Sequence, residues 1–155
     1  MTKLSRYEET GLTPHMEDYI EKIWLLSQSN RVVRVKDIAE SLNIKMPSVT
    51  AAVKRLKESG LIEYEKYGFI ELTDIGKQTA KNIFKKHECL KEFFEKILQL
   101  NETTSGTEAC RMEHHLEKET FERIVRFIDF FNAEKKKNAE WTERLSEALN
   151  SESKQ

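Results

Sequence analysis

The spacing of apolar residues along the chain predicts a series of amphipathic helices interrupted by one short β-hairpin. The first helical pattern begins after Thr13 and runs to about Ser27, since Thr is a favoured N-cap and Pro14 suits the first helical position. Its inward positions are Met16, Tyr19, Ile20, Ile23, Trp24 and Leu26. Residues 1–13 are polar, and we expect this segment to be flexible.

Two shorter helical patterns come next, joined by a turn at residues 43–45. The first covers residues 35–42, and the second starts near Pro47 and ends before Gly60, a residue type favoured just beyond a helix. A tight pair of helices with small residues at the start of the second is typical of a helix-turn-helix motif. A helical hairpin that binds no DNA would show the same periodicity.

A period of two replaces the helical period over residues 61–65 and 69–72, which predicts two antiparallel strands. Residues 66–68 connect them and end in a Gly, as such a turn favours. A hairpin directly after a helix-turn-helix makes a winged helix, so the two signals support each other. The β-branched stretch 32–35 fits either a loop or one edge strand.

The second half of the chain predicts helices alone. A long helix capped by Thr73 is expected from Asp74 to Leu100, and it carries more apolar residues than a small winged-helix core can cover. We therefore expect a second core or a dimer interface there. Residues 101–106 predict a break in the helical pattern. The candidate caps for the next helix are Thr103, Thr104 and Ser105.

Three more helical patterns follow this break. One carries residues 108–115, one covers residues 121–131, and the last repeats Trp141, Leu145 and Leu149 at every fourth position. The lysine run at residues 135–137 predicts a solvated surface between the last two helices.

Composition agrees with a mainly α protein of one or two small domains. The chain has 155 residues, with only five Gly and two Pro. We expect a winged-helix domain over residues 14–75 and a helical domain over residues 76–150. No apolar run approaches the ~18 residues of a membrane span, and no secretory signal is recognisable. Two cysteines, Cys89 and Cys110, make no disulfide framework, so we expect a cytoplasmic protein.

Charge is unevenly distributed, although the net charge is only −1. Residues 31–57 contain seven basic and two acidic side chains, whereas residues 102–152 contain twelve acidic and eight basic ones. Local potential matters more than net charge when a protein binds a polyanion. The basic segment coincides with the predicted helix-turn-helix, which favours binding to double-stranded DNA.

The residues expected to contact DNA are those that the predicted motif leaves outside its core. Small side chains near the start of the second helix would approach base edges, and the later cations would reach phosphates. The base-facing candidates are Ser48, Thr50 and Ala51, the phosphate-facing candidates are Lys54, Arg55 and Lys66, and Lys36, Lys45 and Pro47 complete the predicted surface.

Residues 108–115 place a thiol, two carboxylates and two imidazoles within eight positions. On a helix, Cys110, Glu113 and His114 are spaced i, i+3 and i+4, which puts them on one face. Such a set can bind a divalent transition metal, although an ordinary polar helix face would look the same. Asp18 and Glu21 also share a face of the first helix, where the simpler interpretation is a solvated acidic edge.

Taken in order, these motifs resemble the family of metal-dependent repressors typified by the diphtheria-toxin repressor and the manganese-transport regulator. Four stretches carry the resemblance, and together they extend over most of residues 14–131. They are MEDYIEKI at 16–23, VKDIAE at 35–40, YEKYG with LTDIG at 64–68 and 72–76, and EACRMEH at 108–114.

The resemblance implies a homodimer of winged-helix domains joined by a helical metal-binding and dimerisation domain. It implies that a divalent metal activates binding to a palindromic operator. Asp18, Glu21 and His87 match metal ligands of the manganese branch, Glu113 and His114 match ligands of both branches, and Cys110 matches the thiol of the iron branch. Lys91 and Gly106 replace ligands of the iron branch's auxiliary site, so no second site of that type is expected, and neither is the SH3-like domain of some relatives.

We therefore expect a transcriptional repressor of metal-homeostasis genes, activated by Mn(II) or Fe(II), with Co(II) and Zn(II) effective in vitro. The hard Asp18 and Glu21 ligands favour manganese slightly. One alternative is a metal-independent winged-helix regulator that senses oxidants through Cys110 or Cys89. A metallohydrolase would need a motif such as HExxH, which the sequence lacks, so we expect neither an enzyme nor a small-molecule substrate.

Overall fold

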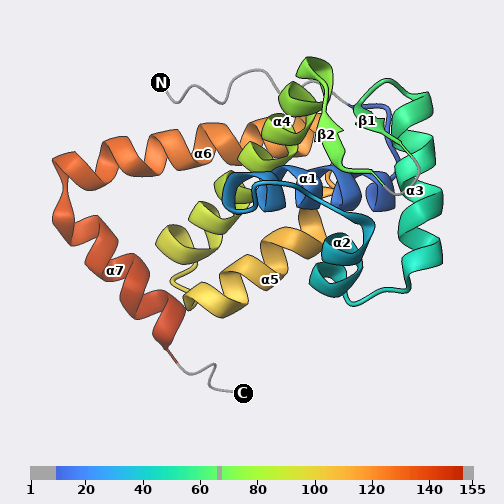
Figure 1. Cartoon of the computed structure of the whole chain (residues 1–155). Coiled ribbons are helices and arrows are strands. Elements are labelled where there is room, and N and C mark those ends of the chain that lie inside the picture. Colours follow the sequence, from blue (N-terminus) through green and yellow to red (C-terminus); the bar gives the residue numbers. More distant parts are fainter. Residues whose placement is uncertain (1–9, 66–67, 152–155) are drawn as a thin grey trace. The chain divides into compact units, whose positions relative to one another are not determined.

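The computed structural model describes residues 10–65 and 68–151 (Figure 1). It contains two compact units, each with its own core. Of the residues described, one unit is built from residues 10–84 and the other from Lys85 onward. The division falls within helix α4 (Asp74–Glu92), which therefore contributes residues to both units. Among the described residues, no helix has the length and apolar character needed to cross a membrane.

The N-terminal unit begins with the three helices that the apolar spacing predicts. They are α1 (Pro14–Ser29), α2 (Val35–Leu42) and α3 (Met46–Glu58). Thr13 is the N-cap of α1, but through its carbonyl, which accepts the backbone N–H of Met16 at 2.8 Å, and not through its hydroxyl. Asn43 takes a left-handed conformation with φ 54° and turns the chain from α2 toward α3. This arrangement confirms the helix-turn-helix.

The hairpin completes the predicted winged helix. Strand β1 (Ile62–Tyr64) pairs antiparallel with β2 (Ile70–Leu72), and Ile62 lies opposite Leu72. The segment expected to be a loop or an edge strand makes a single β-bridge, in which Val33 accepts the backbone N–H of Ile70 at 2.8 Å. The predicted tip residues Lys66 and Tyr67 lie outside the described residues.

The core of this unit comes from one face of each predicted element. Ile20 and Ile23 of α1, Ile38 of α2 and Val53 of α3 are fully buried together. Ile62, Ile70, Ala80 and Ile83 close the same core from the strands and α4. The alternation of buried and exposed residues in the strands therefore reflects one covered face and one solvated face.

The long helix predicted to reach Leu100 ends differently in the structure. After Glu92, the segment η1 (Phe93–Ile97) has π-helical geometry, with Leu98 N–H donating to the carbonyl of Phe93. Gln99 then takes a positive φ of 56° and stops the helix. The expected cap was also wrong, because the side chain of Asn101 accepts the N–H of Thr104 at 2.9 Å and caps the next helix.

The C-terminal unit is helical, as expected. Its helices are α5 (Glu102–Glu113), α6 (Lys118–Lys137) and α7 (Ala139–Asn150). Gly106 lies inside α5 instead of in a break, and the lysines at 135–137 form the exposed last turn of α6. Phe121, Leu90, Phe94 and Phe131 are buried in a second core, which confirms that the surplus apolar surface of α4 belongs to a core of its own.

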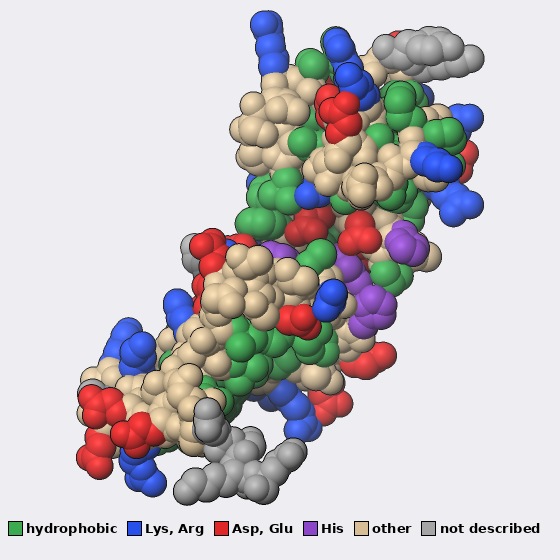
Figure 2. Space-filling view, turned by 90° about the horizontal axis from the view of Figure 1, so that it is seen from below, with side chains coloured by type: hydrophobic (Ala, Val, Ile, Leu, Met, Phe, Trp, Pro, Cys, Tyr) green, Lys and Arg blue, Asp and Glu red, His purple; other side chains and the backbone are tan. Residues whose placement is uncertain are grey.

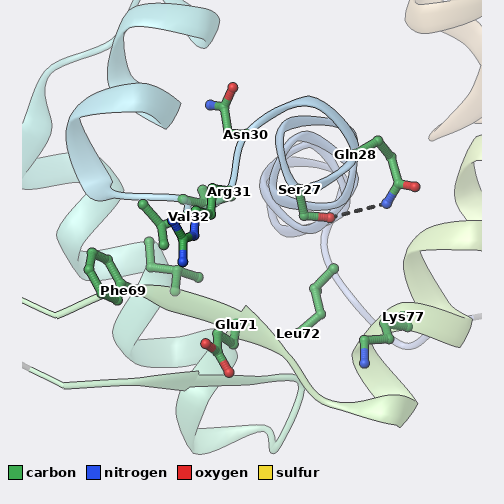
Figure 3. Close-up of a pocket in the computed structure, with 11 residues that line it drawn as sticks. Ser27, Gln28, Asn30, Arg31, Val32, Phe69, Glu71, Leu72 and Lys77 are labelled. Carbon is green, nitrogen blue, oxygen red and sulfur yellow. Dashed lines mark hydrogen bonds between the residues drawn. The ribbon is translucent and has the colours of Figure 1, made fainter.

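A cavity of about 380 Å³ lies in the N-terminal unit, between the end of α1, the bridge segment and β2 (Figure 3). Its lining is mixed, with Arg31, Lys77 and Glu71 at the surface and Val33 and Ile70 below. No His or Cys is among the described residues that line it, so these residues lack the donor set of a transition-metal site.

The start of α4 fits against the preceding turn only because residue 76 is glycine. A methyl group there would overlap the carbonyl oxygen of Leu61, an atom that already accepts the N–H of Thr73 at 3.1 Å. Thr73 Oγ1 also accepts the N–H of Gly76 at 3.0 Å, so the first turn of α4 is fixed on both sides.

We predict that Gly76→Ala destabilises the N-terminal unit by roughly 2 kcal/mol or more, because the backbone must move to relieve the overlap. Gly106→Ala is the matched control, since open space surrounds Gly106 within α5 and Ala favours the helix by up to about 1 kcal/mol. Urea unfolding of both variants measures the difference. Equal stabilities of the two variants would contradict the close contact at Gly76.

Candidate metal centre and DNA-binding surface

The carboxylate of Glu113 lies between two imidazoles in the C-terminal unit. His87 Nδ1 lies 2.8 Å from Glu113 Oε2, and His114 Nε2 lies 3.1 Å from Glu113 Oε1. His87 comes from the middle of α4, Glu113 is the last residue of α5, and His114 is the C-cap of that helix. Residues 26 positions apart thus meet through the packing of α4 and α5.

These three side chains are shielded from water to different degrees. The exposed fraction is 1% for the Glu113 side chain, 4% for His114 and 19% for His87. Glu113 Oε1 accepts no hydrogen bond of good geometry from the described residues. A buried carboxylate of this kind is costly unless positive charge compensates it. Two imidazole nitrogens and a carboxylate are also suitable ligands for Mn(II), Fe(II) or Zn(II), so the donor set fits a divalent metal.

A buried lysine lies beside this cluster. Lys86 precedes His87 and is only 4% exposed, with its ammonium donating to the carbonyl of Leu116 at 3.3 Å. The same group lies 5.7 Å from the ring centroid of Phe121. Lys86 therefore connects α4 to the segment just after His114. No periodicity in the sequence distinguished Lys86 from its solvated neighbours.

Cys110 differs from the other candidates on α5. Its residue is exposed, whereas Glu113 one turn later is buried, so the two side chains lie in different environments. His115 is exposed, and its Nδ1 lies 3.2 Å from the carbonyl of Arg111, which agrees with its exclusion from the predicted ligands. Whether Cys110 binds metal stays a prediction.

Asp18 and Glu21 lie on α1 in the N-terminal unit, three positions apart and both partly buried. The Asp18 carboxylate lies 3.8 Å from Nδ1 of the exposed His15. Burial raises the pKa of Tyr19 above its ordinary value, and the negative charge of Asp18 adds to that effect. Their place among the metal ligands also stays a prediction.

Lys91, which was expected to prevent an auxiliary site, takes part in ion pairs instead. Its ammonium lies 3.2 Å from Glu102 and 3.6 Å from Glu95. The hydrogen bond to Glu102 raises the pKa of Lys91, and the nearby carboxylates add to that shift. The positive charge of Lys91 therefore already compensates these two carboxylates.

The predicted DNA-contacting residues lie around α3. Lys54 and Arg55 are exposed, as are Lys45, Pro47, Ser48 and Ala51 near the start of the helix. Thr50 is half-buried, and its hydroxyl donates to the carbonyl of Met46 at 2.9 Å. Lys36 is exposed on α2 and pairs with Glu40 at 3.5 Å, whereas Lys66 lies outside the described residues.

Two apolar residues of this region were not predicted as surface. Met46 is 51% exposed and Ile44 is 37% exposed, on either side of Lys45. Ile44 lies in the turn before α3 and Met46 is the first residue of α3, so both lie close in sequence to the residues predicted to read base edges. Their exposure could have been predicted from the sequence, because a tight turn buries little apolar surface.

Family models match nearly the whole of this arrangement. The DNA-binding domain of iron-dependent repressors matches residues 11–70, and their metal-binding and dimerisation domain matches residues 73–142. The chain belongs to the iron-dependent repressor family. It is therefore a DNA-binding transcriptional regulator that forms homodimers and uses a divalent metal, and it is not an enzyme. The fold class and the resemblance expected from the sequence are confirmed.

Individual relatives agree with this assignment. An uncharacterised helix-turn-helix regulator of Methanocaldococcus jannaschii is 39% identical over 121 residues, covering 77% of this chain and 97% of the relative. The regulator MntR of Geobacillus thermodenitrificans is 34% identical over 125 residues, covering 81% of this chain and 88% of the relative.

Solved structures of related regulators share the fold. The manganese regulator SloR matches with TM-score 0.65 and 28% identity, covering 77% of this chain and 55% of that one. A manganese-dependent transcriptional repressor in complex with manganese matches with TM-score 0.68 and 26% identity, covering 74% and 53%. The chain thus spans about half the length of these solved proteins.

The alternative of a metal-independent redox regulator finds no support in these comparisons. Cys89 argues against it physically, because the residue is buried in the second core. Burial raises the pKa of the Cys89 thiol to about 12, and the charges of Glu92 and Asp129 contribute in the same direction. The thiolate is the form that reacts with oxidants, so this thiol is chemically inert near neutral pH.

We predict that native Cys89 resists alkylation by iodoacetamide from pH 7 to pH 10, because the folded protein keeps its thiol protonated until the pH approaches about 12. Unfolding in urea should expose Cys89 and restore the pH dependence of an ordinary thiol, which is half ionised near pH 9. Peptide mass spectrometry after timed labelling measures both rates. Rapid labelling of Cys89 in the native protein at pH 8 would contradict its burial.

Proposed function

We propose that this protein is a repressor whose metal centre consists of His87, Glu113 and His114 together with Asp18 and Glu21. The observation that carries the proposal is the buried Glu113 carboxylate between two imidazoles, within the domain that the family uses for metal binding. Cys110 is included as a sixth candidate ligand, since it lies one turn before Glu113 on α5.

The proposed regulation follows from which unit carries each ligand. Asp18 and Glu21 belong to α1 of the N-terminal unit, whereas Glu113 and His114 belong to the C-terminal unit. A bound divalent cation supplies the positive charge that lets carboxylates of both units share one site. In its absence these carboxylates repel one another, so the arrangement that suits DNA is less populated. Only a difference in metal affinity between the two arrangements can shift this equilibrium.

On the choice of metal, we propose Mn(II) ahead of Fe(II). Three carboxylates are hard ligands that suit Mn(II), and the exposed Cys110 is the single soft ligand in the set. The related regulator in complex with manganese supports this order. Co(II) and Zn(II) bind nitrogen and oxygen ligands more tightly than Mn(II), so activation by them in vitro would not identify the physiological metal.

The proposed DNA target is a palindromic operator in the cytoplasm, near genes of metal homeostasis. Two winged helices related by a twofold axis require half-sites of the same symmetry. Ser48 and Ala51 at the exposed start of α3 are proposed to face bases, and Thr50 joins them through its methyl group, since its hydroxyl is bonded within the helix. Lys54 and Arg55 are proposed to face phosphates, together with Lys66.

We predict that Glu113→Ala abolishes metal-dependent operator binding, because it removes the carboxylate shared by both imidazoles. An operator selected from random duplexes with Mn(II) present serves for gel shifts with Mn(II), Fe(II), Co(II) and Zn(II), each buffered to cellular activity. The wild-type chain should bind at least about tenfold more tightly with Mn(II) than without metal.

Glu108→Ala is the matched control for this variant. Glu108 lies on the same helix and pairs with Arg111 at the surface, 3.2 Å away, so its removal should leave metal dependence unchanged. The proposed site is wrong if Glu113→Ala keeps the wild-type response to metal. Strong activation by Fe(II) but not Mn(II) at buffered activities would overturn only the choice of metal.

We predict that Lys54→Ala weakens binding to all DNA sequences by a similar factor and lowers the salt dependence by about one counterion. The reason is that an exposed lysine on α3 contacts a phosphate and reads no base. Lys135→Ala, at the far end of α6, is the control and should leave the salt slope unchanged. Loss of affinity at one base pair alone would contradict a phosphate contact.

A further inference from the structure

One lysine of helix α4 is buried, although lysine is a charged residue. Lys86 is 4% exposed, and Cys89 and Leu90, three and four positions later on the same helix face, are 2% and 0% exposed. The neighbouring Lys81 and Lys85 are exposed, and lysine and arginine side chains project from the surface in the space-filling view (Figure 2). Burial of a charged group is unfavourable unless polar partners compensate it, so the contacts of Lys86 indicate its role.

The Lys86 ammonium contacts the segment that joins α5 to α6. It donates to the carbonyl of Leu116 at 3.3 Å and lies 5.7 Å from the ring centroid of the buried Phe121, in the first turns of α6. The face of an aromatic ring attracts a cation, so the ring and the carbonyl together hold the ammonium in one place. The lysine side chain therefore reaches from α4 to the turn that follows α5.

This turn begins with His114, the C-cap of α5 and a proposed metal ligand. The backbone N–H groups of His115 and Leu116 both donate to the carbonyl of Met112, at 3.0 and 3.2 Å, which attaches the turn to the end of α5. Lys86 attaches the same turn to α4 through the Leu116 carbonyl, two residues after His114. The turn that carries His114 is therefore held from two helices.

We propose that Lys86 is a positioning residue for the metal centre, which holds His114 in place relative to His87 before metal binds. Lys86 directly precedes His87 on α4, so its contact with the Leu116 carbonyl joins the two ligand-bearing segments close to the ligands themselves. Ligands that are already in place lose less conformational freedom on binding, and outer contacts of this kind raise metal affinity. The inference rests on the proposed function, because it assumes that these histidines bind metal.

The chemistry of this position distinguishes positioning from simple core packing. Methionine has nearly the length and volume of lysine, and it would fill the same space without the cost of burying a charge. A buried position that serves packing alone therefore favours an apolar side chain. The feature that lysine adds is the ammonium, and the carbonyl that this group binds belongs to the turn after His114.

Lys86→Met removes the donor and keeps the length of the side chain. Calorimetric titration of the full chain with Mn(II) should show about tenfold weaker binding than in the wild type. Lys86→Arg still carries a donor for the Leu116 carbonyl, so it should bind Mn(II) within about threefold of the wild type. At saturating Mn(II), Lys86→Met should bind the selected operator as tightly as the wild type, because only the occupancy of the metal centre differs.

Ser105→Ala is the matched control in the same unit. Ser105 is buried in α5, and its hydroxyl donates to the carbonyl of Leu100 at 3.4 Å. This variant also loses a buried hydrogen bond to a backbone carbonyl, but at a position more than one turn away from the proposed ligands. It should therefore keep the wild-type affinity for Mn(II).

Four results would overturn the role of Lys86. They are a Lys86→Met chain that binds Mn(II) within about threefold of the wild type, a Lys86→Arg chain as weak as Lys86→Met, equal weakening by Ser105→Ala, and weak operator binding by Lys86→Met at saturating Mn(II). Loss of helical content in Lys86→Met, measured by circular dichroism, would overturn it as well, since Lys86 would then serve the fold and not the ligands.

Glu113→Ala in the same titrations separates this inference from the proposed function. Loss of Mn(II) binding in Glu113→Ala, together with unchanged binding in Lys86→Met, overturns only the role of Lys86. Wild-type Mn(II) binding in Glu113→Ala overturns the metal centre itself and the role of Lys86 with it.

Discussion

The chemistry of the C-terminal unit depends on the electrostatics of one buried carboxylate. Glu113 is 1% exposed, and each of its oxygens faces an imidazole nitrogen at 2.8 or 3.1 Å. A carboxylate removed from water needs positive charge or hydrogen-bond donors nearby, and this requirement connects the end of α5 to the middle of α4. A cation that binds at the Glu113 carboxylate therefore changes the net charge of this buried cluster. At the proposed metal centre, a bound divalent cation would supply that positive charge.

Each unit has its own core of buried apolar side chains. The N-terminal core is formed by α1, α2, α3, the hairpin and the first half of α4, whereas the second half of α4 contributes to the C-terminal core. A single helix, α4, therefore contributes residues to both units. The proposed DNA-contacting residues on α3 belong to one unit, and the buried Glu113 and His114 belong to the other.

The sequence predicted the parts of the fold that follow a regular period. Helices α2 and α3, the hairpin and α7 appear where apolar spacing placed them, because one face of each is buried against a core. The end of α4 and the cap of α5 were not predictable in this way. A π-helical turn keeps the apolar pattern of an α-helix, and Asn101 competed with three neighbouring hydroxyl residues as a cap. The pairing of His87 with Glu113 depends on how two helices pack, which the spacing of residues within one helix does not reveal. Only the family resemblance predicted that these two residues share a site.

The close contact at Gly76 also limits how this protein can change during evolution. Gly76 fixes the first turn of α4 against the carbonyl of Leu61, and His87 follows eleven residues later on the same uninterrupted helix. Inserting or deleting one residue between them would rotate His87 by about 100° around the helix axis and move it by about 1.5 Å along it. The turn at Asn43 or the segment after Leu98 can absorb such a change, since no proposed metal ligand lies on a continuous helix there. Lineages of this regulator should therefore vary in the length of their turns and keep the number of residues between Gly76 and His87 constant.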